Sequence, residues 1–390
     1  MKTYLLWMVL LLQELFYVYF STEPLLISFV FKKITVMVSL GFKQLLFLLL
    51  WGAVFLTGCS GQGNFLGDRD ADEISTSAGM VEHLRKQNIP ALESADVWNN
   101  VYGPGIELET RHYQIYSTLI EPLMLRLLPG FVESAFREYN DQLFRPLETE
   151  NRFTIYLFAD RQQWEDFTDE FTGSRTQVYK KIKAGSYCFK GACVAYNIGR
   201  ERTFSVLGHE GWHQFNGRFF EFRLPSWLDE GIAMLFEASR SEGGMFRFEP
   251  GRNLYRLGDL KNTILNDRMI PLEKLLGMNP GEALMSDDEQ EVRAFYSQVY
   301  ALVRFLREEG YGKRLTSYHQ MLQDGLNGNW PLSNSEKKIA SNRNITLTTG
   351  WNKKIGPRLF KEYFGNDLNA IENEYQRFCR KIVYHIKLKR

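Results

Sequence analysis

Two neighbouring segments, HEGWH at residues 209–213 and LPSWLDEGIA at residues 224–233, carry the most specific pattern in this sequence. His209 and His213 are four residues apart, so on a helix they lie one above the other on the same face. Two imidazoles at that spacing can bind one Zn²⁺ through their ring nitrogens. Glu210 is turned around the helix and can reach a water rather than the metal. The first segment therefore predicts a metal-binding helix; the alternative is a helix with two surface histidines.

The second segment offers the third protein ligand that a catalytic zinc requires. Pro225 and Ser226 mark a helix start, and Ser226 together with Asp229 fits a capping box. Glu230 then lies near the beginning of this helix. Residues 217–224 supply the loop length needed to turn the second helix back toward the first. We therefore predict Glu230 as the third metal ligand.

Two further acidic residues flank this ligand along the chain. Glu237 follows Glu230 by seven residues and lies on the same helix face. There it can accept a hydrogen bond from the second nitrogen of a ligand histidine, which fixes the tautomer of that histidine. The alternative for Glu237 is a surface glutamate. For Asp229, helix capping alone is the preferred interpretation.

Together the two segments resemble the gluzincin clan of zinc metallopeptidases, in particular its peptidase MA-like members. Residues 227–233 are similar to the W-L-x-E-G-x-A signature of the aminopeptidase N group, and the specific match covers residues 203–237. The resemblance implies a zincin-like fold and a bound Zn²⁺, and Glu237 matches a recurring family glutamate. It also implies the roles of four residues: metal ligation by His209, His213 and Glu230, and general-base catalysis by Glu210.

Peptide hydrolysis also needs a hydrogen-bond donor for the developing oxyanion. In the gluzincin clan a tyrosine or histidine of a later helix often serves, which points to Tyr296, with Tyr300 and His319 as other candidates. For each of the two tyrosines, a place in the core or on the surface is the alternative. The aminopeptidase motif G-x-M-E-N is absent, and residues 191–195 read GACVA instead. We therefore predict an endopeptidase whose extended substrate pairs with an edge strand at residues 192–197.

The N-terminal region has the layout of a targeting signal. A start at Met37 would give a cation at Lys43, an apolar run and then the sequence LTGC, which ends at Cys59. This resembles a bacterial lipobox, so we predict lipidation of Cys59 and attachment to a membrane in the bacterial cell envelope. By resemblance to known lipoproteins, Ser60 suggests the outer membrane if the cell is Gram-negative. The alternative is a plain signal peptide.

Further along, short β-rich runs precede a mainly helical region. Residues 107–117 and 153–159 are predicted strands, and Lys190-Gly191 is the predicted turn of a hairpin. Cys188 and Cys193 flank that turn, and they are either a local disulfide or two buried thiols. Residues 203–215, 227–239, 289–309, 313–322, 358–364 and 368–383 are predicted helices. Residues 325–357 show little periodicity and are predicted to be a mobile surface insertion.

These elements predict an α+β protein. Its zincin-like catalytic domain would have a small β-sheet over the active-site helix, and a mainly helical C-terminal subdomain would follow. The predicted divisions are a signal region at 1–58, a lipidated tether at 59–106, the catalytic core at 107–240 and the helical subdomain at 241–390.

The predicted function is a zinc-dependent peptidase of the bacterial cell envelope, with a peptide or protein as substrate. The alternatives are a catalytically silent binding lipoprotein and a zinc hydrolase that acts on peptidoglycan peptides. Residues 59–390 carry 43 basic and 44 acidic side chains, which excludes the basic footprint of a nucleic-acid-binding protein. Nothing in the sequence specifies an oligomeric state.

Overall fold

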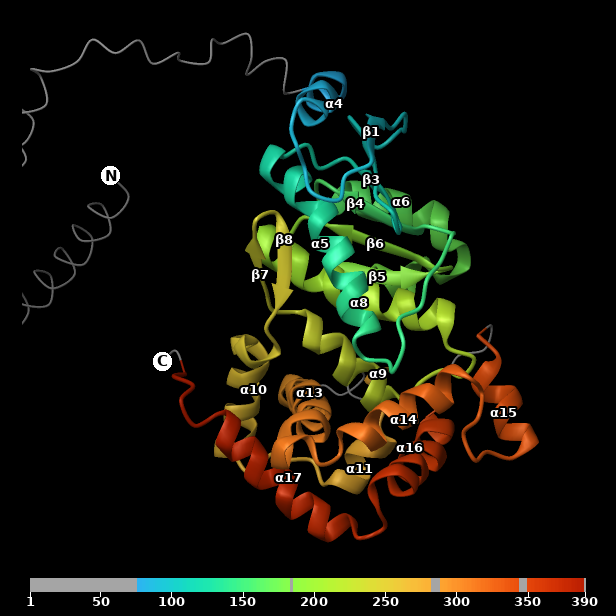
Figure 1. The fold of residues 1–390 in the computed structure, drawn as a ribbon, viewed down its shortest axis with the longest axis vertical. Coiled ribbons are helices and arrows are strands. Elements are labelled where there is room, and N and C mark those ends of the chain that lie inside the picture. The colour runs from blue at the N-terminus through green and yellow to red at the C-terminus, as the bar shows by residue number, and fades with distance from the viewer. Residues whose placement is uncertain (1–75, 183–184, 282–287, 344–348, 389–390) are drawn as a thin grey trace, which may run out of the picture. The chain divides into compact units, whose positions relative to one another are not determined.

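A computed structural model describes residues 76–182, 185–281, 288–343 and 349–388. These residues form a mixed six-stranded sheet, a two-stranded sheet and a helical C-terminal region (Figure 1). The predicted α+β class is confirmed. All described residues belong to one compact unit, residues 68–390.

The large sheet combines antiparallel and parallel pairs. Its strands lie in the spatial order β1 (Ser94–Val97), β2 (Ile106–Glu109), β3 (Tyr113–Ser117), β4 (Phe153–Phe158), β6 (Ala192–Tyr196) and β5 (Ser186–Phe189). Strands β3, β4 and β6 are parallel, whereas β1–β2–β3 and β6–β5 are antiparallel. Strand β5 is therefore the edge that follows the parallel core of the sheet.

Helices cover both faces of this sheet. Helices α5 (Pro122–Asn140) and α8 (Arg200–Phe219) cover one face, and α6 (Arg161–Thr172) covers the other. Side chains alternate between the two faces along a strand. Accordingly, Cys193 belongs to the main core beside α8, whereas Val194 packs in a second cluster with Trp164 of α6. The predicted metal-binding motif thus lies on a helix whose back is buried against the sheet.

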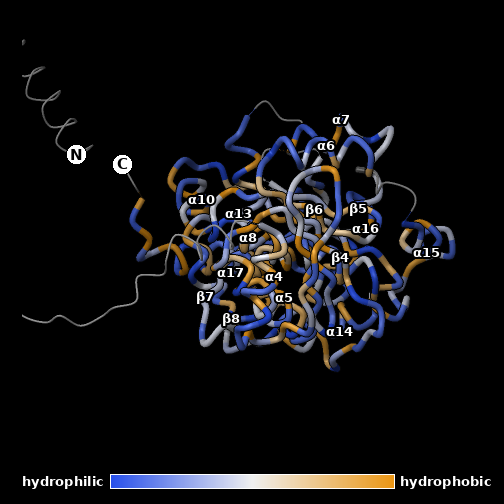
Figure 2. Tube along the Cα trace, turned by 90° about the horizontal axis from the view of Figure 1, so that it is seen from above, coloured by the Kyte–Doolittle hydropathy of each residue, from blue (hydrophilic) through white to orange (hydrophobic). Residues whose placement is uncertain are grey.

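The other helices and strands complete the core. In chain order they are α4 (Ser77–Arg85), η1 (Gly173–Arg175), α7 (Thr176–Tyr179), α9 (Ser226–Ala233), η2 (Met234–Phe236), β7 (Ser239–Glu242), β8 (Met245–Phe248), η3 (Pro250–Arg252), α10 (Leu254–Leu265), α11 (Leu272–Gly277), α13 (Glu289–Gly312), α14 (Leu315–Leu326), α15 (Asn334–Ser341), α16 (Thr349–Phe364) and α17 (Leu368–Ile382). The helices from α10 onward gather at one end of the molecule (Figure 1). Seen from above, apolar segments concentrate inside and the hydrophilic α15 lies at the periphery (Figure 2).

Several local predictions are confirmed, and three are wrong in detail. Strand β4 and the hairpin turn at Lys190-Gly191 are as predicted. Residues 107–117 form two strands rather than one, because Glu133 of α5 satisfies the polar groups of a turn at Thr110 and His112. The predicted edge strand at 192–197 is internal, because β6 pairs with β4 on one side and β5 on the other. Residues 227–239 begin as α9 but end in the short turn η2 and the start of β7.

Two segments predicted to lie outside the core are part of it. Residues 77–97 of the predicted tether form α4 and β1, and Met80 and Leu84 are fully buried. The predicted surface insertion contains α15, whose capping box joins Ser333 and Glu336, and Trp330 is fully buried beside it. Long-range packing gives both segments a structure that their local periodicity does not reveal.

The predicted signal region, including Met37, Cys59 and Ser60, lies outside the described residues. Among the residues that are described, no helix is both long enough and apolar enough to cross a bilayer.

Two glycines allow helices to cross closely around the motif. A Cβ on Gly208 of α8 would lie closer than 3.0 Å to the carbonyl oxygen of Phe236. A Cβ on Gly231 of α9 would lie 2.6 Å from the carbonyl oxygen of Val299 in α13. Backbone atoms cannot easily move aside, so the absence of a side chain at both positions sets the separation of these elements.

We expect Gly208→Ala to destabilise the protein by about 1–3 kcal/mol, because the added methyl group overpacks against the Phe236 backbone. Gly217→Ala on the same helix is the matched control, since a Cβ there meets no atom within 4 Å. The control should be neutral or stabilising by up to about 1 kcal/mol through helix propensity. Urea denaturation of the metal-free proteins measures both changes. Equal stability of the two variants would contradict the packing argument.

Candidate metal centre

Helix α8 is held so that its histidines point away from the sheet. The side-chain amide of Gln214 donates hydrogen bonds to the carbonyl oxygens of Thr154 and Gly191, each at 2.7 Å. Trp212 and Phe215 are fully buried on the same helix. Once these residues anchor one side of α8, the opposite side faces α9.

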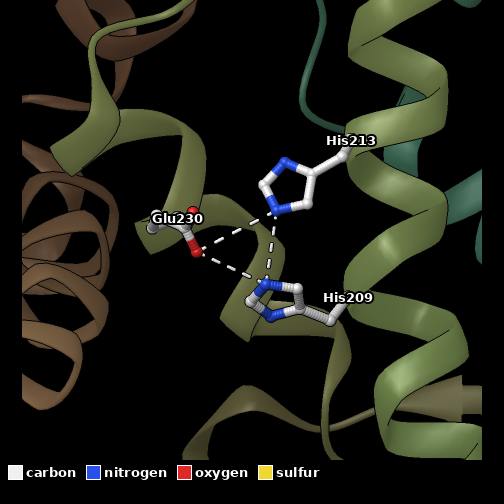
Figure 3. A group of neighbouring side chains, drawn as sticks. All are labelled: His209, His213 and Glu230. Atoms are coloured by element: carbon white, nitrogen blue, oxygen red, sulfur yellow. Dashed lines mark hydrogen bonds and ion pairs between the residues drawn. The ribbon is translucent and has the colours of Figure 1, made fainter. Parts of the chain in front are cut away.

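The three predicted ligands converge from two helices (Figure 3). The Nε2 atoms of His209 and His213 lie 3.3 Å apart. Oε2 of Glu230 lies 3.4 Å from Nε2 of His209 and 3.9 Å from Nε2 of His213. All three side chains are mostly buried, with 14–19% of their surface exposed. The helical spacing of the histidines and the returning second helix are therefore as the sequence predicted.

The spacing of these atoms fits a tetrahedral metal ion. Ligand atoms about 2.0–2.1 Å from a tetrahedral metal would lie about 3.3–3.4 Å apart. Two of the three observed separations agree with that value, and the third is about half an ångström wider. In the described part of the chain, this is the group of His, Cys, Asp and Glu side chains placed to hold an ion. The donor set of two imidazoles and one carboxylate suits zinc.

A carboxylate holds the second nitrogen of His209. Nδ1 of His209 lies 3.0 Å from Oε1 of Glu237, the contact that the sequence predicted. Arg256 donates two hydrogen bonds to the same carboxylate, at 2.8 and 2.7 Å, and Asn253 donates a third at 2.8 Å. Burial raises the pKa of Glu237, but the Arg256 guanidinium outweighs it and lowers this pKa far below its usual value. Glu237 is therefore a fixed anion that orients the His209 ring.

A second carboxylate, Asp229, holds His213. Its Oδ1 atom accepts hydrogen bonds from Trp212 Nε1 at 3.0 Å, His213 Nδ1 at 3.1 Å and Asn216 Nδ2 at 2.9 Å. The predicted capping role is wrong, because α9 begins after Pro225 without any side-chain cap. Asp229 instead turns toward α8 and orients His213. The sequence signal that could have identified this role is the position of Asp229 directly before the predicted ligand Glu230.

Glu210, the predicted general base, is a residue of α8 whose side chain contacts the first residue of the edge strand β5. Its Oε1 atom accepts a hydrogen bond of 3.2 Å from the Ser186 hydroxyl of β5. Glu210 is one residue from His209 and does not belong to the metal-binding group. It is thus adjacent in the chain to His209 and in contact with the first residue of β5.

Of the three predicted oxyanion donors, Tyr296 alone lies near the centre. Burial and then the charge of Glu230 raise the pKa of Tyr296, and the Arg256 guanidinium lies 5.3 Å from its ring centroid. Tyr300 instead donates its hydroxyl to the carbonyl oxygen of Pro250. The ring of His319 packs against Phe144 and Tyr318.

Of the two alternatives for Cys188 and Cys193, the structure has the free thiols rather than the disulfide. The two residues face each other across β5 and β6, but both thiols are free. Burial, followed by the charge of Glu210, raises the pKa of both thiols. Because the thiolate is the reactive form of cysteine, this environment favours the unreactive thiol form of both side chains, of which Cys193 is buried and Cys188 is partly exposed.

The acidic surroundings favour a positive charge between the histidines. Burial lowers the pKa of His209, but hydrogen bonds to Glu230 and Glu237 outweigh it and raise the pKa to about 10. Burial also lowers the pKa of His213, but Asp229 and Glu230 raise it to about 9. Without a metal, protons on the imidazoles balance these carboxylates. A bound cation would take the place of those protons.

Comparison with known proteins adds no relative. No protein-family model matches the chain, and no curated protein matches it either.

We expect the metal-free protein to lose stability between pH 7 and pH 10. A histidine with a raised folded-state pKa stabilises the fold fully below its unfolded value, about 6.5, and loses that contribution as pH rises through the folded value. For His213 and His209 these folded values are about 9 and 10. Thermal denaturation in chelator should therefore show a steeper decline for the wild type than for His213→Gln.

His319→Gln is the matched control for this measurement. Burial lowers the pKa of His319, so it titrates below the tested range and its loss should leave the decline unchanged. Parallel declines for the wild type and His213→Gln would contradict the predicted charge balance.

Proposed function

We propose that this protein is a zinc-dependent peptidase that hydrolyses internal peptide bonds. The observation that carries the proposal is the candidate metal centre: three converging side-chain atoms, with a carboxylate behind each histidine. A chance cluster of surface side chains would not be expected to hold the Nδ1 atoms of both histidines with carboxylates. Such second contacts are a general feature of metal-binding histidines.

The residues around the centre suit peptide hydrolysis. A zinc ion held by His209, His213 and Glu230 would act as a Lewis acid toward a carbonyl group and lower the pKa of a water molecule. Glu210 would accept the proton from the attacking water and later deliver it to the leaving amine. Tyr296 would donate its hydroxyl proton in a hydrogen bond to the developing oxyanion, since burial keeps it protonated.

The free edge of β5 suits an extended substrate. A peptide that pairs with β5 would pass Glu210, because Ser186 at the start of this strand touches that side chain. The acidic residues at the centre are already engaged, Glu237 by Arg256 and Asp229 by three donors. A substrate ammonium would therefore lack a partner and would be costly to bury. This supports endopeptidase rather than aminopeptidase activity.

The proposed location is the bacterial cell envelope, with a lipid anchor on Cys59. The proposal rests on the lipobox-like sequence before this residue. Mass spectrometry of the membrane fraction should find acyl chains on Cys59 and no residues before it. A mature chain that retains residues 1–58 would refute the anchor without affecting the catalytic proposal.

Two glutamate substitutions separate metal binding from catalysis. Glu230→Ala should lose most of the bound zinc, because one of three ligands is removed. Glu210→Gln should keep one zinc per chain and lose at least about 10²-fold in peptide hydrolysis, because an amide cannot accept the proton. Metal analysis and a peptide-library digest measure both effects, and each variant controls for the other. Full zinc retention by Glu230→Ala, or undiminished hydrolysis by Glu210→Gln, would refute the assigned role.

The preference for internal bonds is tested with blocked peptides. Wild-type protein should cleave peptides with acetylated N-termini at internal bonds as well as it cleaves the same peptides with free N-termini, because Glu237 and Asp229, the described carboxylates behind the histidines, already pair with protein donors. Chromatography with mass spectrometry identifies the products. Release of single N-terminal residues from the free peptides only would show an aminopeptidase instead.

A further inference from the structure

Strand β5 connects the candidate centre to a group of cations at its far end. The strand begins at Ser186, whose hydroxyl contacts Glu210, and ends at Phe189. The Lys190 ammonium lies 5.2 Å from the centroid of the Phe189 ring, and the Arg175 guanidinium lies 5.7 Å from it. One aromatic ring therefore gathers two positive charges beside the end of the strand.

The outer edge of β5 has backbone groups that are not used by the sheet, and they are most accessible near Cys188. Phe189 and Ala192 flank the two-residue turn as a hydrogen-bonded pair, and hydrogen-bonded pairs alternate along an antiparallel ladder. Ser186 and Cys188 therefore direct their N–H and C=O groups outward. Within the described residues, these four groups have no backbone partner. Cys188 is partly exposed whereas Ser186 is 4% exposed, so the accessible pairing position for an added strand is at Cys188, toward Phe189.

The cations beside this edge are not neutralised by nearby acids. Arg175 and Lys190 are exposed, and neither forms an ion pair with a described carboxylate. The neighbouring Lys180, in contrast, lies 2.6 Å from Asp169. This end of the edge thus has an excess of positive charge, which attracts anionic partners and repels cationic ones.

On the basis of the proposed function, we propose that the preferred substrate carries acidic side chains on the N-terminal side of the cleaved bond. A strand that pairs antiparallel to β5, the slightly more stable arrangement, has its N-terminal side toward Phe189 and its C-terminal side toward Glu210. Lys190 follows Ser186 by four positions, which corresponds to about 13 Å at the usual rise of a strand. The acidic side chains would therefore precede the cleaved bond by about three to five residues.

The test uses two mixtures of labelled, acetylated peptides. Both contain three fixed residues followed by six randomised ones, and the fixed residues are glutamates in one mixture and glutamines in the other. Binding is measured by fluorescence anisotropy on the zinc-loaded Glu210→Gln protein, and cleavage is measured on the wild type. We expect about fivefold tighter binding and faster cleavage of the glutamate mixture at low salt, with the difference lost in high salt.

Removing the positive charges beside β5 tests whether the preference for the glutamate mixture arises at this surface. The double variant Arg175→Gln/Lys190→Gln should bind both mixtures equally, and Lys190→Glu should disfavour the glutamate mixture. Lys86→Gln is the matched control, because this exposed lysine directly follows α4, which packs beside β1 at the opposite edge of the sheet. It should leave the preference intact.

The outcomes separate this inference from the proposed function. Equal binding of the two mixtures, or a preference that survives in the double variant, overturns the inference. If both mixtures are cleaved at the same rate, the peptidase proposal stands and the acidic preference fails. If neither mixture is cleaved but binding of the glutamate mixture depends on Arg175 and Lys190, the peptidase proposal fails. The inference that this basic surface binds acidic peptide segments then stands.

Discussion

One carboxylate oxygen, Oδ1 of Asp229, joins α9 to α8 through three hydrogen bonds. Because Glu230 is the next residue, the contact that fixes Asp229 also fixes the direction of Glu230. The candidate metal centre depends on this arrangement, since two ligands come from α8 and the third from α9. The close approach of α9 to α13 at Gly231 holds the second helix from its other side.

Charge balance is the second constraint on this region. Glu230, Glu237 and Asp229 are mostly buried carboxylates within a few ångströms of two histidines. Burying unpaired charges is costly, so each anion must have a positive or hydrogen-bonding partner. Arg256 pairs with Glu237, and hydrogen-bond donors on α8 pair with Asp229. Glu230 and the Nε2 atoms of the two histidines are therefore the groups that face a bound cation. The same positive charge would organise the chemistry that we propose.

The C-terminal helices are part of the site rather than a separate appendage. Arg256 comes from the start of α10, and Tyr296 comes from α13, which packs against α9. A single hydrophobic core contains side chains of the sheet, of α8 and of the C-terminal helices. The catalytic and helical parts predicted at residues 107–240 and 241–390 therefore share one core, and the second part supports the first at the metal centre.

The sequence alone determined what depends on neighbouring residues. Helical spacing placed His209 and His213 on one face and Glu210 beside them, and the Lys190-Gly191 turn specified a hairpin. It did not reveal the partner of Asp229, the pairing of Arg256 with Glu237, or the edge position of β5. The contacts of Asp229 and Arg256 depend on which distant helices pack together. The edge position of β5 depends on the pairing of β6, rather than β5, with β4. Only the tertiary structure decided these contacts, because burial and charge pairing act between segments that no local periodicity connects.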